Sequence, residues 1–307
     1  MEEEKKLQTD AHPQIWAVGG GKGGVGKSTI AILLAFWLAR MGKRTILVDL
    51  DLGGANLHTL MGIKSPPKTL NDFVTKRLDS LEEVCIETHI ENLRLICGDS
   101  DVLTLANPHV AQKIKIIHHV SKLDADYIVL DLGAGTSFNV LDFFLVAERK
   151  IVVLSPQPTS IQNAYSFVRN AVFRRLSRLA SQQPSLQALI KSAMDENNEL
   201  RVRTIRELLQ AAEDISGKEV KETLQKEIEA IRPAVITNMV TNSNEKNAGR
   251  VIQLVSEKYL MIYPRDLGSV AYDKQIIQMV SDMEPITKLV QSSNAFANTY
   301  DITMKLL

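Results

Sequence analysis

Short runs of apolar, often β-branched residues alternate along this chain with longer segments in which apolar residues recur at helical spacing. Several short runs are apolar almost throughout, which is typical of strands buried on both faces of a parallel sheet. The alternation predicts an α/β fold with a doubly wound, mostly parallel sheet covered by helices. The expected strands are Ile15–Gly19, Thr45–Asp49, Leu93–Cys97, Tyr127–Asp131, Ile151–Ser155, Ala234–Asn238 and Leu260–Tyr263. The expected helices are Lys27–Met41, Leu70–Thr75, Ala106–Lys122, Phe138–Ala147, Ser160–Leu179, Glu245–Lys258 and Asp273–Ser281.

One stretch, from about residue 174 to residue 232, contains no strand-like run. Its Leu, Ile and Ala residues recur at helical spacing, so we expect a helical insertion there. Residues 169–206 carry eight basic and three acidic side chains, whereas residues 207–229 carry three basic and seven acidic ones, so the two halves can pair with each other. We therefore expect a flexible N-terminal tail over residues 1–13 and a single domain over residues 14–307 that this insertion interrupts.

The composition narrows the possible classes of protein. The 307 residues include 36 basic and 36 acidic side chains, so no overall charge attracts the molecule to nucleic acid or anionic lipid. Cys85 and Cys97 form no C-x-x-C pair, which argues against a disulfide scaffold and favours a reducing compartment. The sequence shows no signal peptide and no apolar run long enough to span a bilayer. We expect a cytoplasmic protein.

The strongest motif lies between the first expected strand and the first expected helix. The segment Gly21-Lys22-Gly23-Gly24-Val25-Gly26-Lys27-Ser28-Thr29 matches the P-loop form G-x-x-x-x-G-K-[ST]. Its backbone N–H groups and the following helix N-terminus would bind phosphate oxygens. Lys27 would neutralise the β- and γ-phosphates, and the Ser28 hydroxyl would ligate Mg²⁺. The segment predicts a protein that binds ATP with Mg²⁺.

Two acidic segments follow expected strands. The first contains Asp49, the last residue of its expected strand, and Asp51. In the second, Asp131 is the last residue of an apolar strand. Acids at these positions lie at the carboxyl edge of a parallel sheet, where open α/β folds bind ligands. An apolar strand that ends in an acid is typical of a Walker B segment, so Asp131 would hold Mg²⁺ through water.

A second lysine inside the loop, Lys22, makes the P-loop resemble the deviant Walker A motif of the MinD/ParA family of ATPases. The resemblance implies that Lys22 reaches the phosphates of a partner subunit's nucleotide across a dimer face. It implies that Asp51 orients or deprotonates the attacking water near the metal, and that Asn56 lies close to the γ-phosphate. Gly133 would turn its N–H toward the same phosphate. Lys22, Lys27 and Asp51 are thus the expected catalytic residues.

Further segments resemble the same family, and together the match covers about 250 residues. Asn238 stands where the family has an asparagine that contacts adenine. Pro264 and Asp266 stand where a proline-acid loop covers the base. The segments around Asp51 and Asp131 resemble the MinD-like FlhG/FleN group most, which implies a role in flagellar number and placement.

Two surfaces outside the nucleotide site offer possible partners. Residues 286–307 contain only two cations, so we expect their apolar residues to pack on the core, with peripheral binding to the inner face of the membrane as the alternative. Arg174, Arg175 and Arg178 lie on one predicted helix and could grip nucleic-acid phosphates. We favour instead their pairing with the acidic half of the insertion.

These residues predict a slow, Mg²⁺-dependent ATP hydrolase that acts as a switch: ATP closes a homodimer, hydrolysis opens it, and a protein partner or activator reads the state. The biological role would be spatial regulation, such as flagellar placement, cell division or cargo positioning. The alternatives are a P-loop metallocluster carrier or reductase component, which Cys85 and Cys97 disfavour, and a small-molecule ligase or kinase, in which Lys22 has no clear use. A pseudo-enzyme that only binds nucleotide is disfavoured by Asp51.

Overall fold

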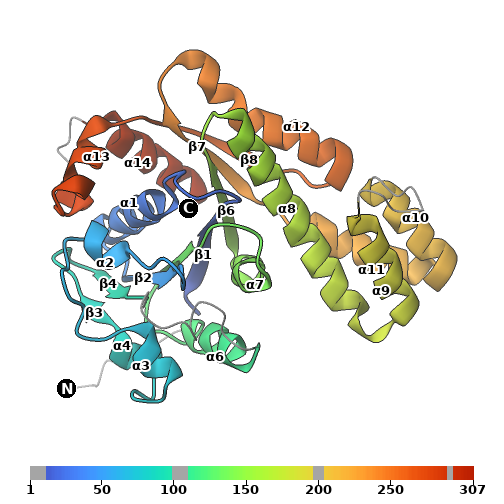
Figure 1. Cartoon of the computed structure of the whole chain (residues 1–307), viewed down its shortest axis with the longest axis horizontal. Helices are drawn as coiled ribbons and strands as arrows, with labels where there is room; N and C mark the ends of the chain where they lie inside the picture. Colours follow the sequence, from blue (N-terminus) through green and yellow to red (C-terminus); the bar gives the residue numbers. More distant parts are fainter. Residues whose placement is uncertain (1–11, 99–109, 196–203, 289–292) are drawn as a thin grey trace, which may run out of the picture.

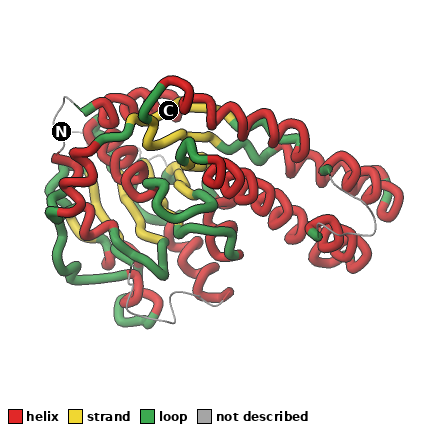
Figure 2. Tube along the Cα trace, turned by 45° about the horizontal axis from the view of Figure 1, so that its top comes forward, coloured by secondary structure: helices red, strands yellow, loops and turns green. Residues whose placement is uncertain are grey.

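The computed structural model describes residues 12–98, 110–195, 204–288 and 293–307, and in them it has one eight-stranded sheet between layers of helices (Figures 1 and 2). The strand order is β3-β4-β2-β5-β1-β6-β7-β8, and every pair is parallel except β3 with β4. The predicted doubly wound α/β fold is confirmed. The strands are β1 (Gln14–Gly19), β2 (Thr45–Leu50), β3 (Ile86–Glu87), β4 (Leu93–Ile96), β5 (Tyr127–Leu132), β6 (Arg149–Leu154), β7 (Ala234–Val240) and β8 (Arg265–Ala271).

Helices cover both faces of the sheet. Consecutive residues of β1 alternate between the two cores: Ile15 and Ala17 belong to one cluster, Trp16 and Val18 to the other. The helices α1 and α14 pack on the Trp16 side, and α6, α7, α8 and α12 pack on the Ile15 side. The helices are α1 (Lys27–Arg40), α2 (Leu57–Leu60), α3 (Leu70–Val74), α4 (Leu81–Val84), α6 (Val110–Val120), α7 (Phe138–Val146), α8 (Pro158–Leu179), α9 (Pro184–Met194), α10 (Ile205–Ser216), α11 (Lys218–Glu229), α12 (Ala248–Leu260), α13 (Lys274–Ser281) and α14 (Asn294–Leu306).

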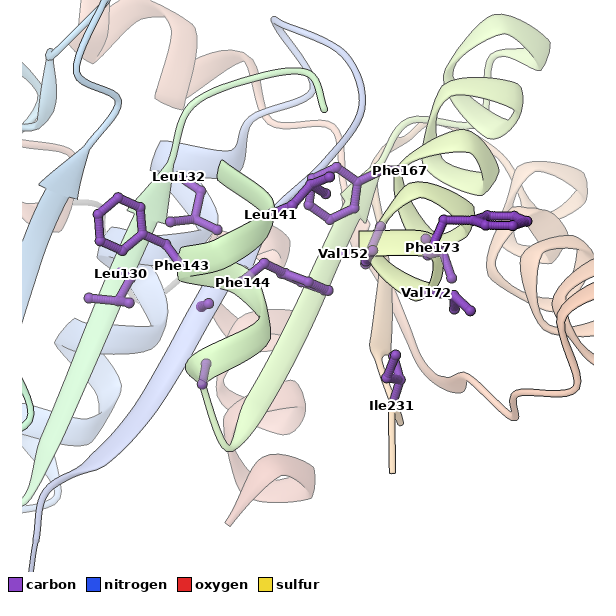
Figure 3. Close-up of a cluster of buried hydrophobic side chains, with 14 of the residues drawn as sticks. Leu130, Leu132, Leu141, Phe143, Phe144, Val152, Phe167, Val172, Phe173 and Ile231 are labelled. Atoms are coloured by element: carbon purple, nitrogen blue, oxygen red, sulfur yellow. The ribbon is translucent and has the colours of Figure 1, made fainter. Parts of the chain in front are cut away.

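The core between α7 and α8 is rich in phenylalanine (Figure 3). Phe144 of α7 and Phe167 of α8 meet edge to face with ring centroids 4.8 Å apart. Such pairs contribute about 0.5–1.5 kcal/mol beyond the burial of their area. The two helices are therefore held firmly against β1 and β6.

The predicted insertion consists of helices in the described residues. The helices α9 and α11 pack on α8, α10 packs on α9 and α11, and the group extends away from the sheet (Figure 1). Their buried residues, which include Leu189, Leu208 and Leu224, continue the core on the Ile15 side of the sheet. Thr204 begins α10 with a capping box, in which its side chain and that of Glu207 each accept a backbone N–H.

The sequence prediction was wrong near residue 260. Leu260–Tyr263 is not a strand, because α12 continues to Leu260 and ends where Met261 adopts a left-handed conformation. The strand is β8, which follows at Arg265 and contains charged and small residues because it forms the edge of the sheet. Three predicted segments lie partly outside the described residues: residues 1–11 of the tail expected over residues 1–13, the first part of the helix expected at Ala106–Lys122, and residues 196–203 of the insertion.

Near the C-terminus, α14 packs its buried residues Phe296, Ile302 and Leu306 against the core, as expected. Met304 and Leu307 of the same segment are exposed, and Leu289 and Val290 lie outside the described residues. Among the helices that the structure describes, none has the length and apolar character needed to cross a bilayer.

Candidate nucleotide-binding site

The P-loop connects β1 to α1 at the carboxyl edge of the sheet. Gly26 precedes α1 with φ of 84°, a left-handed conformation that favours glycine. The Asn238 side chain at the end of β7 donates a hydrogen bond of 2.9 Å to the Val25 carbonyl. A Cβ on Gly26 would lie 2.2 Å from the Asn238 Nδ2 atom, so this position admits only glycine. The loop is thus shaped before any ligand binds.

Lys27 begins α1 and is buried, with 7% of its surface exposed. Burial lowers the pKa of the Lys27 ammonium, while the nearby charges of Asp131 and Asp51 oppose that shift. A buried ammonium beside free backbone N–H groups at a helix N-terminus is suited to bind an anion such as a triphosphate. Ser28 and Thr29 follow it in the first turn of α1.

Asp131 ends β5 beside Asp49 of β2, its register partner. Both of its carboxylate oxygens are buried and lack a hydrogen-bond partner of ordinary geometry in the described residues, although the Ser28 hydroxyl lies close enough to affect its pKa. Burial, followed by the charge of Asp49, raises the pKa of Asp131 well above its usual range. Two unpartnered oxygens beside a serine hydroxyl are the hard ligands that Mg²⁺ prefers, so the residues present fit this ion.

Asp49 organises the loop that follows β2, a role that the sequence analysis did not assign to it. Its buried carboxylate accepts backbone N–H bonds from Asp51 (3.1 Å), Asn56 (3.0 Å) and Leu57 (3.1 Å). Burial raises its pKa to about 6, although these hydrogen bonds act in the opposite direction. The loop thereby holds Asp51 and Asn56 at the mouth of the site. The signal was available in the sequence: Asp49 is an acid within an otherwise apolar strand.

The loop after β5 touches the loop after β2 at Gly133. A Cβ on Gly133 would lie 2.9 Å from the Asp51 Oδ1 atom, so a larger residue would displace the carboxylate. We call residues 133–137, between β5 and α7, the switch II loop. The absence of a side chain at residue 133 lets this loop approach Asp51.

A cleft of about 360 Å³ joins these parts, and we call it the P-loop cleft. Asp51 and Asn56 line one of its walls, and Ile276, Ile277 and Val280 of α13 line another. Most predicted phosphate- and metal-binding residues therefore meet in one place. Its P-loop lining comprises Gly23, Gly24, Gly26, Lys27, Ser28 and Thr29.

Lys22 lies in a different cleft. Its Nζ atom donates a hydrogen bond of 3.1 Å to the Thr159 hydroxyl in the first turn of α8. This second cleft, of about 320 Å³, is lined by Lys22 and by Ser155, Pro156 and Gln157 at the end of β6. The two clefts adjoin and share Gly23, Gly24 and Met239, but Lys22 lines only the second one, while Lys27 and Asp51 line only the first.

The interpretation of Pro264 and Asp266 requires correction. Asp266 pairs with Val235 near the start of β7, so both residues lie at the amino edge of the sheet, opposite the P-loop. Asp266 instead accepts a hydrogen bond from the Gly268 N–H group. The segment at the carboxyl end of β8 is residues 271–273, which borders Thr29 and Asn238. The error followed from the misplaced strand.

The arginines considered for nucleic-acid binding are paired within the chain. Arg174 makes two hydrogen bonds of 2.8 Å to Asp142 of α7, and Arg178 lies 3.8 Å from the same carboxylate. Arg175 bonds Glu227 of α11 at 2.7 Å, which is the pairing with the acidic half that we favoured. Arg174 and Arg175 are therefore engaged within the chain, whereas the Arg178 side chain stays 49% exposed, so the three do not form a shared phosphate-binding face.

Comparisons with known proteins agree with the nucleotide-binding site described above. The family profile ParA, described as "NUBPL iron-transfer P-loop NTPase", matches residues 12–174, more than half of the chain. Antiactivator FleN of Pseudomonas aeruginosa is 33% identical over 167 residues, which cover 53% of this chain and 59% of FleN. The iron-sulfur cluster carrier protein of Bacillus subtilis is 33% identical over 162 residues, which cover 51% of this chain and 44% of the carrier.

The chain spans about half the length of these two relatives. Among solved structures, septum site-determining protein MinD of Pyrococcus horikoshii, complexed with Mg-ADP, superposes with a TM-score of 0.65. The two share 19% sequence identity, and the alignment covers 96% of each chain, so this likeness shows the fold. The profile match, the P-loop and the fold agree, and the chain belongs to the ParA/MinD family of P-loop NTPases.

Proposed function

We propose that this protein is a Mg²⁺-dependent ATPase whose ATP-bound form closes into a homodimer and whose hydrolysis reopens it. One observation carries the proposal: Lys22 lies outside the cleft that holds Lys27 and Asp51. A P-loop lysine that does not line its own P-loop cleft is placed to act on the nucleotide of a second copy. The bond to Thr159 would then have to break when the dimer closes.

Different residues of one subunit would bind the phosphates, activate the water and hold the metal ion. Lys27 and the P-loop N–H groups bind the β- and γ-phosphates, and Asn56 and Gly133 border the γ-phosphate. Asp51 orients a water molecule whose oxygen attacks the γ-phosphorus, and it accepts the proton that the water loses. The bond to the β,γ-bridging oxygen breaks, so that ADP and phosphate form. Ser28, Asp51 and Asp131 would hold Mg²⁺, which would neutralise charge on the phosphate oxygens.

The adenine base would lie between Thr29, Asn238 and residues 271–273, which line one small cavity beside the P-loop. This position replaces the one expected at Pro264 and Asp266. Asn238 would keep its bond to Val25 and so connect the base pocket with the phosphate loop.

The dimer face would include α13. No residue of this eight-residue helix is buried, and Ile277 and Val280 are 47% and 37% exposed while they line the P-loop cleft. Exposed aliphatic residues at the rim of a charged cleft are suited to burial against a second copy. They would also exclude water from the closed site.

Asp51→Ala should retain ATP binding but hydrolyse ATP about a hundredfold to ten-thousandfold more slowly. Because the ATP state then persists, ATP with Mg²⁺ should convert the variant to a dimer, and ADP should leave it monomeric. Light scattering coupled to size-exclusion chromatography measures this directly. The wild-type protein with ADP is the control. A variant that binds ATP and stays monomeric at every protein concentration tested would refute the dimer switch.

Ile277→Asp should weaken the ATP-dependent dimer roughly tenfold, because a charge would be buried at the rim of the face. Because Ile277 also lines the P-loop cleft and the small cavity beside it, binding of a fluorescent ATP analogue to the monomer is measured in parallel, and the dimer constants are compared at saturating ATP. Leu254→Asp is the matched control, since Leu254 is an exposed aliphatic residue of α12 on another surface. Sedimentation of both variants in the Asp51→Ala background separates the two surfaces, and equal dimerisation would exclude α13 from the interface.

For the biological role, we propose spatial regulation read by a protein partner at the cytoplasmic side of the membrane. FleN, described as an antiactivator, and the flagellum site-determining protein YlxH of Helicobacter pylori, 33% identical over 155 residues, support this choice. The similarity to the iron-sulfur cluster carrier protein of Bacillus subtilis supports the alternative of a metallocluster carrier. That alternative is disfavoured because burial raises the pKa values of Cys85 and Cys97 to about 12, which keeps both thiols protonated and poor as metal ligands.

A further inference from the structure

Arg174 contacts α7 at two successive turns. Its guanidinium makes two hydrogen bonds of 2.8 Å to Asp142 in the second turn of α7. The same group lies over the ring of Phe138, the first residue of α7, at 4.4 Å from the ring centroid. We propose that Arg174 is a positioning residue for ATP hydrolysis, which holds the switch II loop through α7 and thereby connects that loop to the helical insertion.

The position of α7 determines the position of the switch II loop. The loop is only five residues long, from Gly133 to Ser137, and Ser137 caps α7 by accepting the Val140 N–H bond at 3.4 Å. Its other end follows Asp131 and Leu132 of β5, which are fixed in the sheet. A shift of the first turn of α7 would therefore act on the loop from its Ser137 end. The Gly135 N–H group donates a bond of 3.3 Å to the carbonyl of Gly20, the residue before the P-loop, so the middle of the switch II loop lies against the phosphate-binding segment.

The anchor at Asp142 is strong because it is buried. Only 4% of the Asp142 side chain is exposed, and Lys113 of α6, itself 7% exposed, pairs with it from the other side. Burial acts to raise the pKa of Asp142, but the hydrogen bonds from Arg174 and Lys113 outweigh it and lower the pKa. The bidentate geometry fixes direction as well as distance. Lysine at residue 174 could not reproduce it.

The same helix reaches the insertion. Arg175, the next residue of α8, pairs with Glu227 of α11 at 2.7 Å, and both α9 and α11 pack on α8. The first turn of α8 holds Lys22 through Thr159. One straight helix therefore connects the insertion, α7 and the P-loop lysine, as Figure 1 shows for α8 and its neighbours.

The test compares two adjacent residues of α8. Arg174→Gln removes the bidentate contact with Asp142 and the contact with Phe138, but leaves the Phe144–Phe167 packing and the pairs of Lys113 and Arg178 with Asp142. Arg175→Gln breaks only the pair with Glu227. In the full-length chain, Arg174→Gln should lower the kcat for ATP hydrolysis about threefold to thirtyfold, with the KM and the Kd for ATP unchanged. Arg175→Gln should keep the wild-type kcat. Arg174→Lys should behave like Arg174→Gln.

A second measurement does not need turnover. Amide hydrogen exchange of residues 133–142 in the nucleotide-free protein should become faster in Arg174→Gln and stay unchanged in Arg175→Gln. If exchange there is unchanged, or if Arg174→Gln raises KM as much as it lowers kcat, the inference is overturned. The inference rests on the proposed function only for its kinetic part. Wild-type protein that hydrolyses no ATP would refute that function, and the exchange result would still decide the role of Arg174.

Discussion

Replacing Lys27 with alanine should reduce the affinity for ATP roughly a hundredfold or more, the largest effect on binding that we expect from one side chain. Lys27 is the buried cation at the start of α1, and its removal leaves Asp131 and Asp51 without the charge that balances them. The site would then repel a triphosphate. Calorimetric titration with a non-hydrolysable ATP analogue measures the loss.

Lys22→Ala is the matched control, because it removes a second lysine from the same loop. Lys22 lines the neighbouring cleft, so ATP should bind its monomer with nearly wild-type affinity. Hydrolysis and dimer formation should be lost instead. If Lys22→Ala lost ATP affinity to the same extent as Lys27→Ala, Lys22 would act within its own subunit and the shared site would be refuted.

Asp131→Asn should reduce ATP hydrolysis roughly tenfold to a hundredfold, because the residue would no longer hold Mg²⁺ through water. The same change should raise the thermal stability of the nucleotide-free protein by a few degrees. The folded-state pKa of Asp131 is raised, so the ionised carboxylate costs stability at every pH above the unfolded value of 3.8. The neutral amide removes that cost. Phosphate release and calorimetry in a chelator measure the two effects.

Asp142→Asn is the control, because its expected change in thermal stability has the opposite sign. Asp142 is also a buried aspartate, but its pKa is lowered by Arg174 and Lys113, so its charge stabilises the fold above the unfolded pKa. Its replacement should lower the melting temperature of the same metal-free protein. If both variants changed stability in the same direction, the proposal that the Asp131 charge destabilises the fold and the Asp142 charge stabilises it would be refuted.

The sequence predicted the sheet and the phosphate half of the site well, because both depend on local patterns. Apolar runs identify buried strands such as β5, and the P-loop requires particular residues at fixed spacing. The edge strand β8 was missed because its one exposed edge allows charged and small residues that resemble a loop. Because of that error, the base contact was expected at Pro264 and Asp266, which lie at the edge of the sheet opposite the P-loop.

Contacts between distant segments were not predictable in the same way. Nothing near Arg174 in the sequence indicates that its partner is Asp142 of α7, while its neighbour Arg175 pairs with Glu227. Adjacent helical residues point about 100° apart, so their partners depend on which elements pack on each side of α8. The role of Asp49 also depends on the folded loop, whose backbone N–H groups turn back onto the strand.

The strand order has a consequence for folding during synthesis. β1, which carries the P-loop, has as its sheet neighbours β5 and β6, whose residues pair at Tyr127 and Arg149 and beyond. During synthesis the first strand must wait until those segments have left the ribosome, and closing such long loops slows folding. The phosphate loop is translated early and completed late. A nascent chain that stops before residue 149 should therefore present this motif and bind no nucleotide.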